Sequence, residues 1–255
     1  MLHEQHPPAN EGTVFITGSG SGIGLEFARQ YAMRGWTVIA THRSDARPAA
    51  LAALQDRFPA IVRVESLDVT NCEKLSAVRK VLEGVPIDVL LNNAAVIRTE
   101  PLIPRDGNRN QKLGTLDYRL GMTFMDANVL GPLRVVEALA DNVKASRQKK
   151  IVTMSSAAGM VSGPLPASGD HYWYRSSKAA LNSVMKLVAA DLRSSGVTVV
   201  FLHPGGVAVE SFAGQDVPGL QAPAVVIPKL MKVIDGLSIE DTGRFLTNDG
   251  NDQPW

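Results

Sequence analysis

The sequence predicts an α/β fold in which short buried strands alternate with amphipathic helices in one domain. Its 255 residues, 45% of them hydrophobic, are enough to build one large core. Residues 12–17 form a β-branched and aromatic run that leads into a glycine-rich turn and then a helical pattern. Further strand-like runs follow between helical patterns. We therefore expect residues 12–255 to form a single domain, preceded by a disordered leader over 1–11.

The bulk composition narrows the class of ligand. Lys and Arg number 26 against 25 Asp and Glu, without a long basic run, so a nucleic acid is not an expected partner. No stretch of roughly 18 apolar residues occurs, which predicts no membrane span, and residues 1–11 lack the pattern of a secretion signal. The lone Cys72 fits a reducing compartment. We expect a cytoplasmic protein with small-molecule ligands and no metal.

The turn after the first strand has the composition of a phosphate-binding loop. Strand, glycines and helix follow one another in the order that lets backbone N–H groups approach a pyrophosphate at the positive end of a helix. A Cβ at the tight positions would block that approach. The helix should close at Gly35. The residues expected to bind a dinucleotide here are Gly18, Ser19, Ser21, Gly22, Ile23 and Gly24.

The end of the second strand, residues 37–43, bears on the choice of dinucleotide. A dinucleotide-binding fold presents an acid here to the ribose hydroxyls, or a base to a 2′-phosphate. Arg43 stands at this point, and we interpret it as a phosphate clamp that favours NADP(H). Asp45 is the alternative, because as the ribose acid it would make NAD(H) the cofactor.

The third strand, expected over 61–66 after a helix at 48–58, also ends in candidate ligand residues. Asp68 and Val69 follow it. Asp68 caps the helix expected over 72–82, lies at the adenine ring, or does both. Strand ends of an open sheet line the ligand crevice, so both residues are candidate cofactor contacts.

The fourth strand, 88–91, ends in two amides and two small residues. Asn93 and Ala94 within this run suit a close approach of the backbone to a ligand, and a plain turn is the alternative. Residues 98–117 carry prolines, glycine and polar residues, which predicts a surface connection. A long helix should then span about 118–147. Asn128 inside it is a poor helix former, so we expect a local distortion or a polar role there.

The last strands are expected at 150–154, at 198–203 and near Phe245. The first of them delivers Ser155 and Ser156 to the same sheet edge as the glycine turn. The second is followed by three candidate cofactor contacts, which are Pro204, Gly205 and Val207. Between the second and third, the glycine- and proline-rich run 212–227 predicts a mobile flap, followed by a helix over 228–234.

Tyr174 and Lys178 lie four residues apart in another predicted helix, which ends before Gly196. That spacing places the two side chains on one face. A phenol has a reference pKa of about 10, and a fixed ammonium beside it favours the phenolate and lowers that pKa. Tyr174 would then give or take a proton. The alternative is a surface tyrosine beside a solvated lysine.

Taken in chain order, these motifs resemble those of the short-chain dehydrogenases/reductases. The resemblance covers about residues 12–210, and the runs YRSSKAALN and HPG are similar to the C-factor and Sniffer-like carbonyl reductase group. It implies a Rossmann fold, with a doubly wound sheet of seven parallel strands and helices on both faces. The motifs are Thr17-Gly18-x-x-x-Gly22-Ile23-Gly24, Asn92-Asn93-Ala94, Asn128, Ser155/Ser156, Tyr174-x-x-x-Lys178 and Pro204-Gly205.

The resemblance also implies a catalytic tetrad. Tyr174 would protonate a carbonyl oxygen as hydride arrives from nicotinamide C4, while Lys178 lowers the pKa of Tyr174 and holds the nicotinamide ribose. Ser156, favoured over Ser155, would hydrogen-bond the carbonyl oxygen as charge develops. Asn128 would anchor a water that joins Lys178 to solvent.

The resemblance further implies a small carbonyl or alcohol substrate and assembly as a homodimer or homotetramer. A non-catalytic dinucleotide-binding signalling protein, as in the C-factor group, is the alternative. Two positions depart from the family pattern: Ala95 replaces a glycine, and Val209 stands where a threonine is usual. A lost side-chain hydrogen bond at Val209 is worth about 1 kcal/mol, which predicts weaker cofactor binding rather than lost activity.

Overall fold

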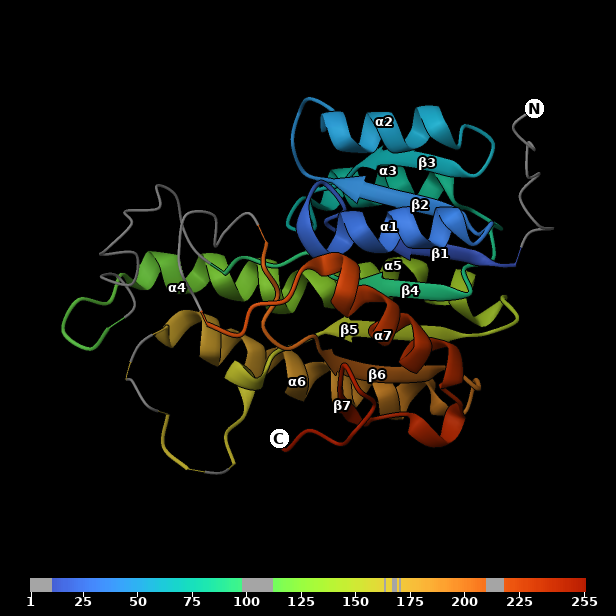
Figure 1. The fold of residues 1–255 in the computed structure, drawn as a ribbon. Helices are drawn as coiled ribbons and strands as arrows, with labels where there is room; N and C mark the ends of the chain where they lie inside the picture. Colours follow the sequence, from blue (N-terminus) through green and yellow to red (C-terminus); the bar gives the residue numbers. More distant parts are fainter. Residues whose placement is uncertain (1–10, 98–111, 163, 167–168, 170, 210–217) are drawn as a thin grey trace.

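The computed structural model describes residues 11–97, 112–162, 164–166, 169, 171–209 and 218–255. Within them the chain alternates strands and helices around one sheet, which is the predicted α/β architecture in a single domain (Figure 1). Residues 1–10 of the expected leader and 98–111 of the expected surface connection lie outside these described residues.

Seven parallel strands form the sheet, in the spatial order β3-β2-β1-β4-β5-β6-β7. The winding reverses between β1 and β4, and a crevice outside the carboxyl ends of the strands is expected at such a point. The predicted seven-stranded, doubly wound sheet is therefore confirmed. The strands are β1 Thr13–Ile16, β2 Thr37–His42, β3 Val62–Ser66, β4 Val89–Asn92, β5 Lys150–Met154, β6 Thr198–His203 and β7 Phe245–Thr247.

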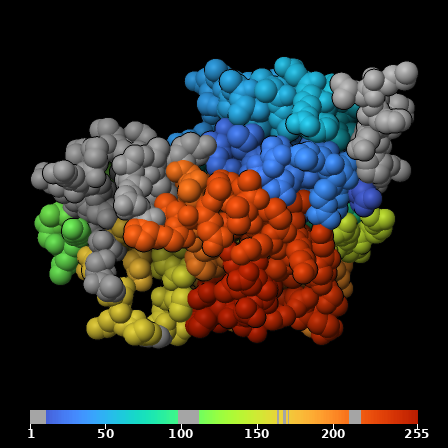
Figure 2. Space-filling view, in the orientation of Figure 1, coloured from blue at the N-terminus to red at the C-terminus, as the bar shows by residue number. Residues whose placement is uncertain are grey.

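Helices cover both faces of the sheet because successive strand residues point to opposite sides. Val14 and Ile16 belong to one core and Phe15 to the other. Figure 2 shows α7 and the C-terminal segment across the face turned to the viewer. The first core is covered by α1 Gly22–Met33, α2 Ala49–Arg57 and α7 Pro223–Gly236, and the second by α3 Cys72–Val81, α5 Gly131–Lys144 and α6 Tyr172–Arg193.

The long helix predicted over 118–147 is divided into three parts. α4 Tyr118–Met125 leads into a π-helical turn, Asp126–Leu130, and then into α5. Asn128 lies at the centre of the turn. Pro132 has no N–H to bond the carbonyl four residues earlier, so the helical ladder is free to widen there. The long helix is therefore present as far as Lys144, and the distortion expected at Asn128 interrupts it.

Helix α7 begins at Pro223, earlier than the predicted start at Pro228. Proline is well suited to the first helical position, where an N–H has no partner. Pro228 lies inside the helix, and the burial of neighbours such as Leu230 outweighs the lost hydrogen bond. The flap predicted over 212–227 is therefore wrong for its helical part, while residues 210–217 lie outside the described ranges.

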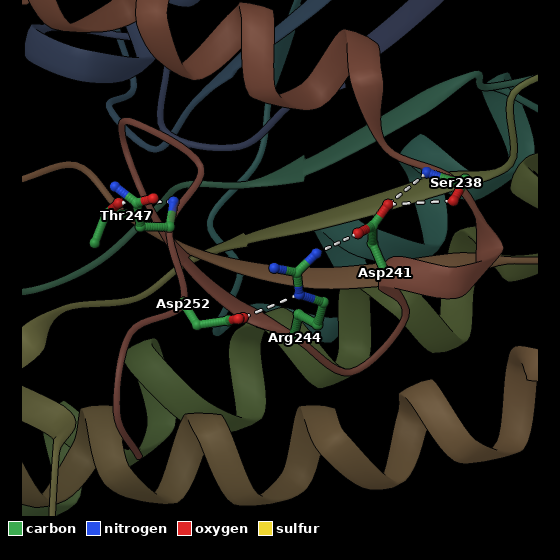
Figure 3. A network of polar contacts seen from close by, with 6 residues as sticks. Ser238, Asp241, Arg244, Thr247 and Asp252 are labelled. Carbon is green, nitrogen blue, oxygen red and sulfur yellow. Dashed lines mark hydrogen bonds and ion pairs between the residues drawn. The ribbon is translucent and has the colours of Figure 1, made fainter.

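The chain after β7 folds back and is held by a polar network (Figure 3). Arg244 donates to Asp241 at 2.6 Å and to Asp252 at 2.9 Å. Ser238 and Asp241 form a capping box around a short 3-10 helix. These contacts tie the C-terminal segment to the edge of the sheet at β7.

Candidate active site

The candidate residues gather at the carboxyl edge of the sheet, where α4 and the first turns of α6 project beyond the strands (Figure 1). Tyr118 of α4 packs against Trp173 of α6, with ring centroids 5.6 Å apart. The turns after β1, β2, β4, β5 and β6 all open at this edge. The sequence motifs therefore converge on one region.

The glycine turn is fastened to the turn after β4. Thr17 Oγ1 accepts from the backbone N–H groups of Asn93 at 2.9 Å and Ala94 at 3.0 Å. Asn93 Nδ2 donates back to the carbonyls of Thr17 and Gly18. A Cβ on Gly18 would lie 2.8 Å from Ala94 Cα, and one on Gly24 only 2.3 Å from the Gly18 oxygen. The glycines are thus required by the packing of the two turns as well as by any approaching phosphate.

The serines of the glycine turn face different ways. Ser19 is buried and its hydroxyl donates to the Ile16 carbonyl at 3.1 Å, so that side chain is used within the fold. Ser21 is exposed at the N-cap of α1 and makes no side-chain capping hydrogen bond. Ile23 packs against the first core. Of the two serine hydroxyls, only that of Ser21 is placed for a ligand.

Arg43 is exposed immediately after β2, beside the glycine turn. A Cβ on Gly20 would lie 3.8 Å from His42 Cβ, which shows how close the two segments are. Within the described residues, Arg43 and Asp45 have no hydrogen bond or ion pair. His42 is buried, and burial lowers its pKa. The Arg43 guanidinium is therefore a cation without a partner in the described part of the chain at this strand end, where Arg47 and Lys74 also lie close enough to lower the pKa of His42.

Asp68 does not cap α3. Its Oδ1 accepts from the backbone and hydroxyl of Thr70, at 2.9 and 2.7 Å, while Asn71 is the N-cap and accepts from Lys74 N–H. The capping interpretation of Asp68 is therefore wrong, because a local turn places Asn71 at the helix start. Val69 is 8% exposed and packs on the start of α5.

Ser156, Tyr174 and Lys178 come together between β5 and α6. Burial raises the pKa of Tyr174, and a hydrogen bond with Ser156 opposes that rise because its hydroxyl favours the phenolate. Lys178 Nζ lies 5.9 Å from the centre of the Tyr174 ring and donates to the Met154 carbonyl at 2.8 Å. Burial lowers the pKa of Lys178 to about 8. The pKa of Tyr174 is therefore raised in this structure, and the lowering expected from Lys178 is wrong here, because burial outweighs the opposing hydrogen bond from Ser156.

Asn128 is fully buried and its side chain is already engaged. Its Oδ1 accepts from Val96 N–H at 2.7 Å, and its Nδ2 donates to the Val96 carbonyl at 2.8 Å and to Ser177 Oγ at 3.0 Å. Both amide hydrogens are used. The side chain therefore joins the turn after β4 to α6, and sequence reasoning missed both partners because neither Val96 nor Ser177 carries a distinctive motif.

The segment after β6 is held by the C-terminal part of the chain. Asn248 Nδ2 donates to the Pro204 carbonyl at 3.0 Å. Gly205 has a φ of 78°, a conformation that favours glycine. Val207 forms an isolated parallel bridge with Gln221. These contacts fix the backbone where cofactor binding was predicted.

Other classes of site are not evident in the described ranges. No group of three or more His, Cys, Asp or Glu residues in them is arranged to hold a metal ion. In the same ranges, no helix is both long and apolar enough to cross a bilayer.

Comparison with known proteins identifies the family. A family model for short chain dehydrogenases matches residues 12–216. The chain belongs to the short chain dehydrogenase family. The chain is 34% identical over 249 residues to the 1-hydroxy-2-glutathionyl-2-methyl-3-butene dehydrogenase of Rhodococcus sp., covering 95% of this chain and 99% of that one.

Two further similarities bear on the narrower group. The C-signal protein of Myxococcus xanthus is 35% identical over 170 residues, covering 67% of this chain and 93% of that one. The NADPH-bound carbonyl reductase from chicken fatty liver superimposes with a TM-score of 0.82 at 25% identity, covering 97% of this short chain dehydrogenase and 100% of the reductase. The resemblance to the C-factor and carbonyl reductase group is confirmed.

Proposed function

We propose that this short chain dehydrogenase transfers hydride between C4 of NADP(H) and a carbonyl or alcohol carbon, with Tyr174 as acid/base. The observation that carries the proposal is the hydrogen bond between Ser156 and Tyr174, beside the buried amine of Lys178. A phenol, a hydroxyl and an amine at the end of a dinucleotide crevice are the groups that carbonyl reduction requires.

The chain's own residues supply the proton and the oxyanion contact. Ser156 donates a hydrogen bond to the substrate oxygen, and Tyr174 donates its proton to that oxygen as negative charge develops. Bound NADPH supplies the hydride. In the direction of alcohol oxidation, the Tyr174 phenolate accepts the hydroxyl proton. Asn128 acts indirectly, by holding the π-helical turn against Val96 and Ser177.

Lys178 supports Tyr174 through charge. With a pKa of about 8, its amine is largely protonated at neutral pH and favours the phenolate nearby. The Met154 carbonyl occupies one of the three ammonium hydrogens. The two others remain for a nicotinamide ribose, and we infer that this is how Lys178 reaches the cofactor.

The choice of NADP(H) rests on Arg43. Its exposed guanidinium, at the end of β2 beside the glycine turn, suits the 2′-phosphate. Cofactor contacts are proposed along the rest of the sheet edge, with NAD(H) as the alternative if Asp45 binds the ribose. The residues proposed to make these cofactor contacts are Gly18, Ser21, Gly22, Ile23, Gly24, Asp68, Val69, Asn93, Ala94, Pro204, Gly205 and Val207.

The catalytic proposal is favoured over a signalling role without catalysis. The similarity to the C-signal protein motivates that second function. The buried, hydrogen-bonded arrangement of Ser156, Tyr174 and Lys178 has no purpose in a pure dinucleotide sensor, since burying Lys178 carries a free-energy cost. The test is NADPH consumption with a panel of ketones, aldehydes and quinones, and consumption of NADP⁺ with the matching alcohols. No turnover with any member would favour the sensor.

A homodimer or homotetramer and a cytoplasmic location remain predictions. Large apolar side chains on α4 and α6 are exposed, with Tyr118 at 73%, Met122 at 71% and Leu187 at 66%. Such residues supply apolar area for self-association. Light scattering on the purified protein measures its mass, and a monomer at all concentrations would contradict the prediction.

A further inference from the structure

Three side chains on one face of α6 contact three consecutive residues at the end of β5. Tyr174, Lys178 and Asn182 are spaced four apart, so their side chains lie in one row along the helix. They face residues 154–156, which are the last residue of β5 and the first two residues of the turn after it. Tyr174 hydrogen-bonds Ser156, Lys178 Nζ donates to the Met154 carbonyl at 2.8 Å, and Asn182 Oδ1 accepts from Ser155 Oγ at 2.6 Å.

The contact between Ser155 and Asn182 is buried and short. Each residue is 4% exposed, and 2.6 Å is at the short end of the range for an O–H···O hydrogen bond. The backbone N–H of Ser155 also donates to the Leu202 carbonyl at 2.8 Å, which fixes it to β6. The turn is therefore held from the sheet on one side and from Asn182 on the other.

The segment after the turn packs tightly against α6. The 3-10 helix Ala157–Gly159 lies directly on α6, because a Cβ on Gly159 would be 2.8 Å from the Lys178 carbonyl carbon. Ser156 caps this short helix by accepting from Ala158 N–H at 3.1 Å. A shift of Ser155 would therefore move Ser156, which is its direct neighbour.

We propose that Asn182 is a positioning residue that acts through Ser155 to hold Ser156 against Tyr174. Its catalytic consequence rests on the proposed function of the site. Asn182 does not contact the phenol itself. Its hydrogen bond to Ser155 fixes the distance between the turn and α6. In the row of three contacts, Tyr174 and Lys178 would then act at the reaction, and Asn182 would fix their geometry relative to the turn.

The hydrogen bonding of Asn182 indicates why an amide, and not an apolar side chain, occupies this position. Its Nδ2 is buried and has no hydrogen-bond partner among the described residues. A buried donor without a partner costs free energy, and an apolar side chain on this face of α6 would avoid that cost. The acceptor oxygen for Ser155 is what an apolar residue would lack.

The inference is tested by following Tyr174 directly. The carbon that bears the Tyr174 hydroxyl is observed by NMR in protein labelled at tyrosine Cζ, and its resonance is identified by its loss in Tyr174→Phe. Ser156→Ala shows the shift caused by losing the Ser156 hydrogen bond. Asn182→Ala and Ser155→Ala should move the resonance in the same direction, and Asn182→Ala added to Ser156→Ala should move it no further.

Turnover gives the second readout. With NADPH and 4-nitrobenzaldehyde, Asn182→Ala and Ser155→Ala should each lower kcat by about 10-fold to 10²-fold, the range for a small misplacement of a catalytic group. The KM for NADPH should stay within about twofold. The matched control is Asn142→Ala, because Asn142 is likewise a helical asparagine with a hydrogen-bonded side chain, but its Nδ2 donates to the Leu82 and Val85 carbonyls at the far end of α5. It should leave both readouts unchanged.

Two results would overturn the inference. One is an unchanged Tyr174 resonance in both Asn182→Ala and Ser155→Ala, and the other is an Asn182→Ala effect that persists in full in the Ser156→Ala background. If Asn182→Ala does not fold, Ser155→Ala alone decides, since it removes only a hydroxyl. Coupled resonances together with normal turnover by Tyr174→Phe would instead contradict the proposed function and leave the positioning role intact.

Discussion

Lys178 Nζ lies 2.8 Å from the Met154 carbonyl oxygen and donates to it from a side chain that is 3% exposed. This contact joins α6 to the end of β5 next to Tyr174. Burial disfavours the ammonium and lowers the pKa of Lys178 from 10.5 to about 8. Burial therefore disfavours the charged form of an amine that lies one helical turn from Tyr174.

The first prediction concerns the pH dependence of stability. Because the folded-state pKa of Lys178 lies below its unfolded value, the folded protein binds fewer protons between pH 8 and pH 10.5. The contribution of Lys178 to the free energy of unfolding therefore rises with pH across this window and is lost as pH falls toward 8. Lys178→Met should be more stable than wild type at pH 7 by about 3 kcal/mol at most, since the lost hydrogen bond to the Met154 carbonyl offsets part of the gain, and this advantage shrinks toward pH 10.5.

Chemical denaturation at several pH values measures this difference. Lys186→Met is the matched control, since Lys186 is on the same helix but exposed, with its amine 4.3 Å from the Trp255 ring centre. It should follow the wild-type pH curve. A Lys178→Met protein that is less stable than wild type at pH 7 would contradict the prediction.

The second prediction concerns the glycine turn. Gly24→Ala should destabilise the protein by about 1–3 kcal/mol and weaken cofactor binding, because the new Cβ would lie 2.3 Å from the Gly18 oxygen and 2.5 Å from Asn93 Nδ2. Thermal unfolding and a cofactor titration measure the two effects. Gly236→Ala is the control, since a Cβ there meets nothing within 4 Å, and it should be neutral or slightly stabilising. Equal behaviour of the two variants would argue against the tight contact of the turns.

The third prediction concerns cofactor choice. An Arg43 guanidinium on a 2′-phosphate forms charge-assisted hydrogen bonds worth roughly 1.5–3 kcal/mol, so NADPH should bind at least about tenfold more tightly than NADH. Arg43→Ala should remove most of this preference, and high salt should reduce it in wild type.

Dissociation constants for both nucleotides at low and high ionic strength decide the matter. Arg57→Ala is the control, because Arg57 lies at the opposite end of α2 over the Phe58 ring and should not affect the ratio. If wild type binds NADH as tightly as NADPH, the phosphate clamp is wrong, and Asp45 becomes the residue that selects the cofactor.

Much of the fold was predictable because local signals agree with the tertiary structure. The strands at 150–154 and 198–203 have the predicted bounds, since β-branched runs there are flanked by turn residues. The local signals give the wrong start for α7. Pro228 predicts a helix start, but its buried neighbours keep it inside the helix. Propensity there is overridden by packing, which no local pattern records.

The site was predictable only in part, because its tertiary contacts also leave no local pattern in the sequence. Helical spacing placed Tyr174 and Lys178 on one face, and this arrangement is present. The hydrogen bonds from Lys178 to the Met154 carbonyl and from Asn128 to Val96 join residues far apart in sequence. Backbone groups carry no signature of residue type, so contacts to them become visible only once the fold sets the distances.

The central claim is that Tyr174 is the proton donor of a hydride-transfer enzyme. Tyr174→Phe removes one hydroxyl and retains the ring, so the packing between β5 and α6 should persist. The matched control is Tyr172→Phe, because Tyr172 is 37% exposed on the same helix and outside the cluster with Ser156.

The measurement that tests this claim most directly is kcat for NADPH oxidation by 4-nitrobenzaldehyde in wild type, Tyr174→Phe and Tyr172→Phe, together with the NADPH dissociation constant of each. We predict that Tyr174→Phe lowers kcat by a factor of about 10² to 10⁴ with the dissociation constant nearly unchanged, while Tyr172→Phe retains wild-type turnover. A Tyr174→Phe protein that turns over within a few-fold of wild type would contradict the account.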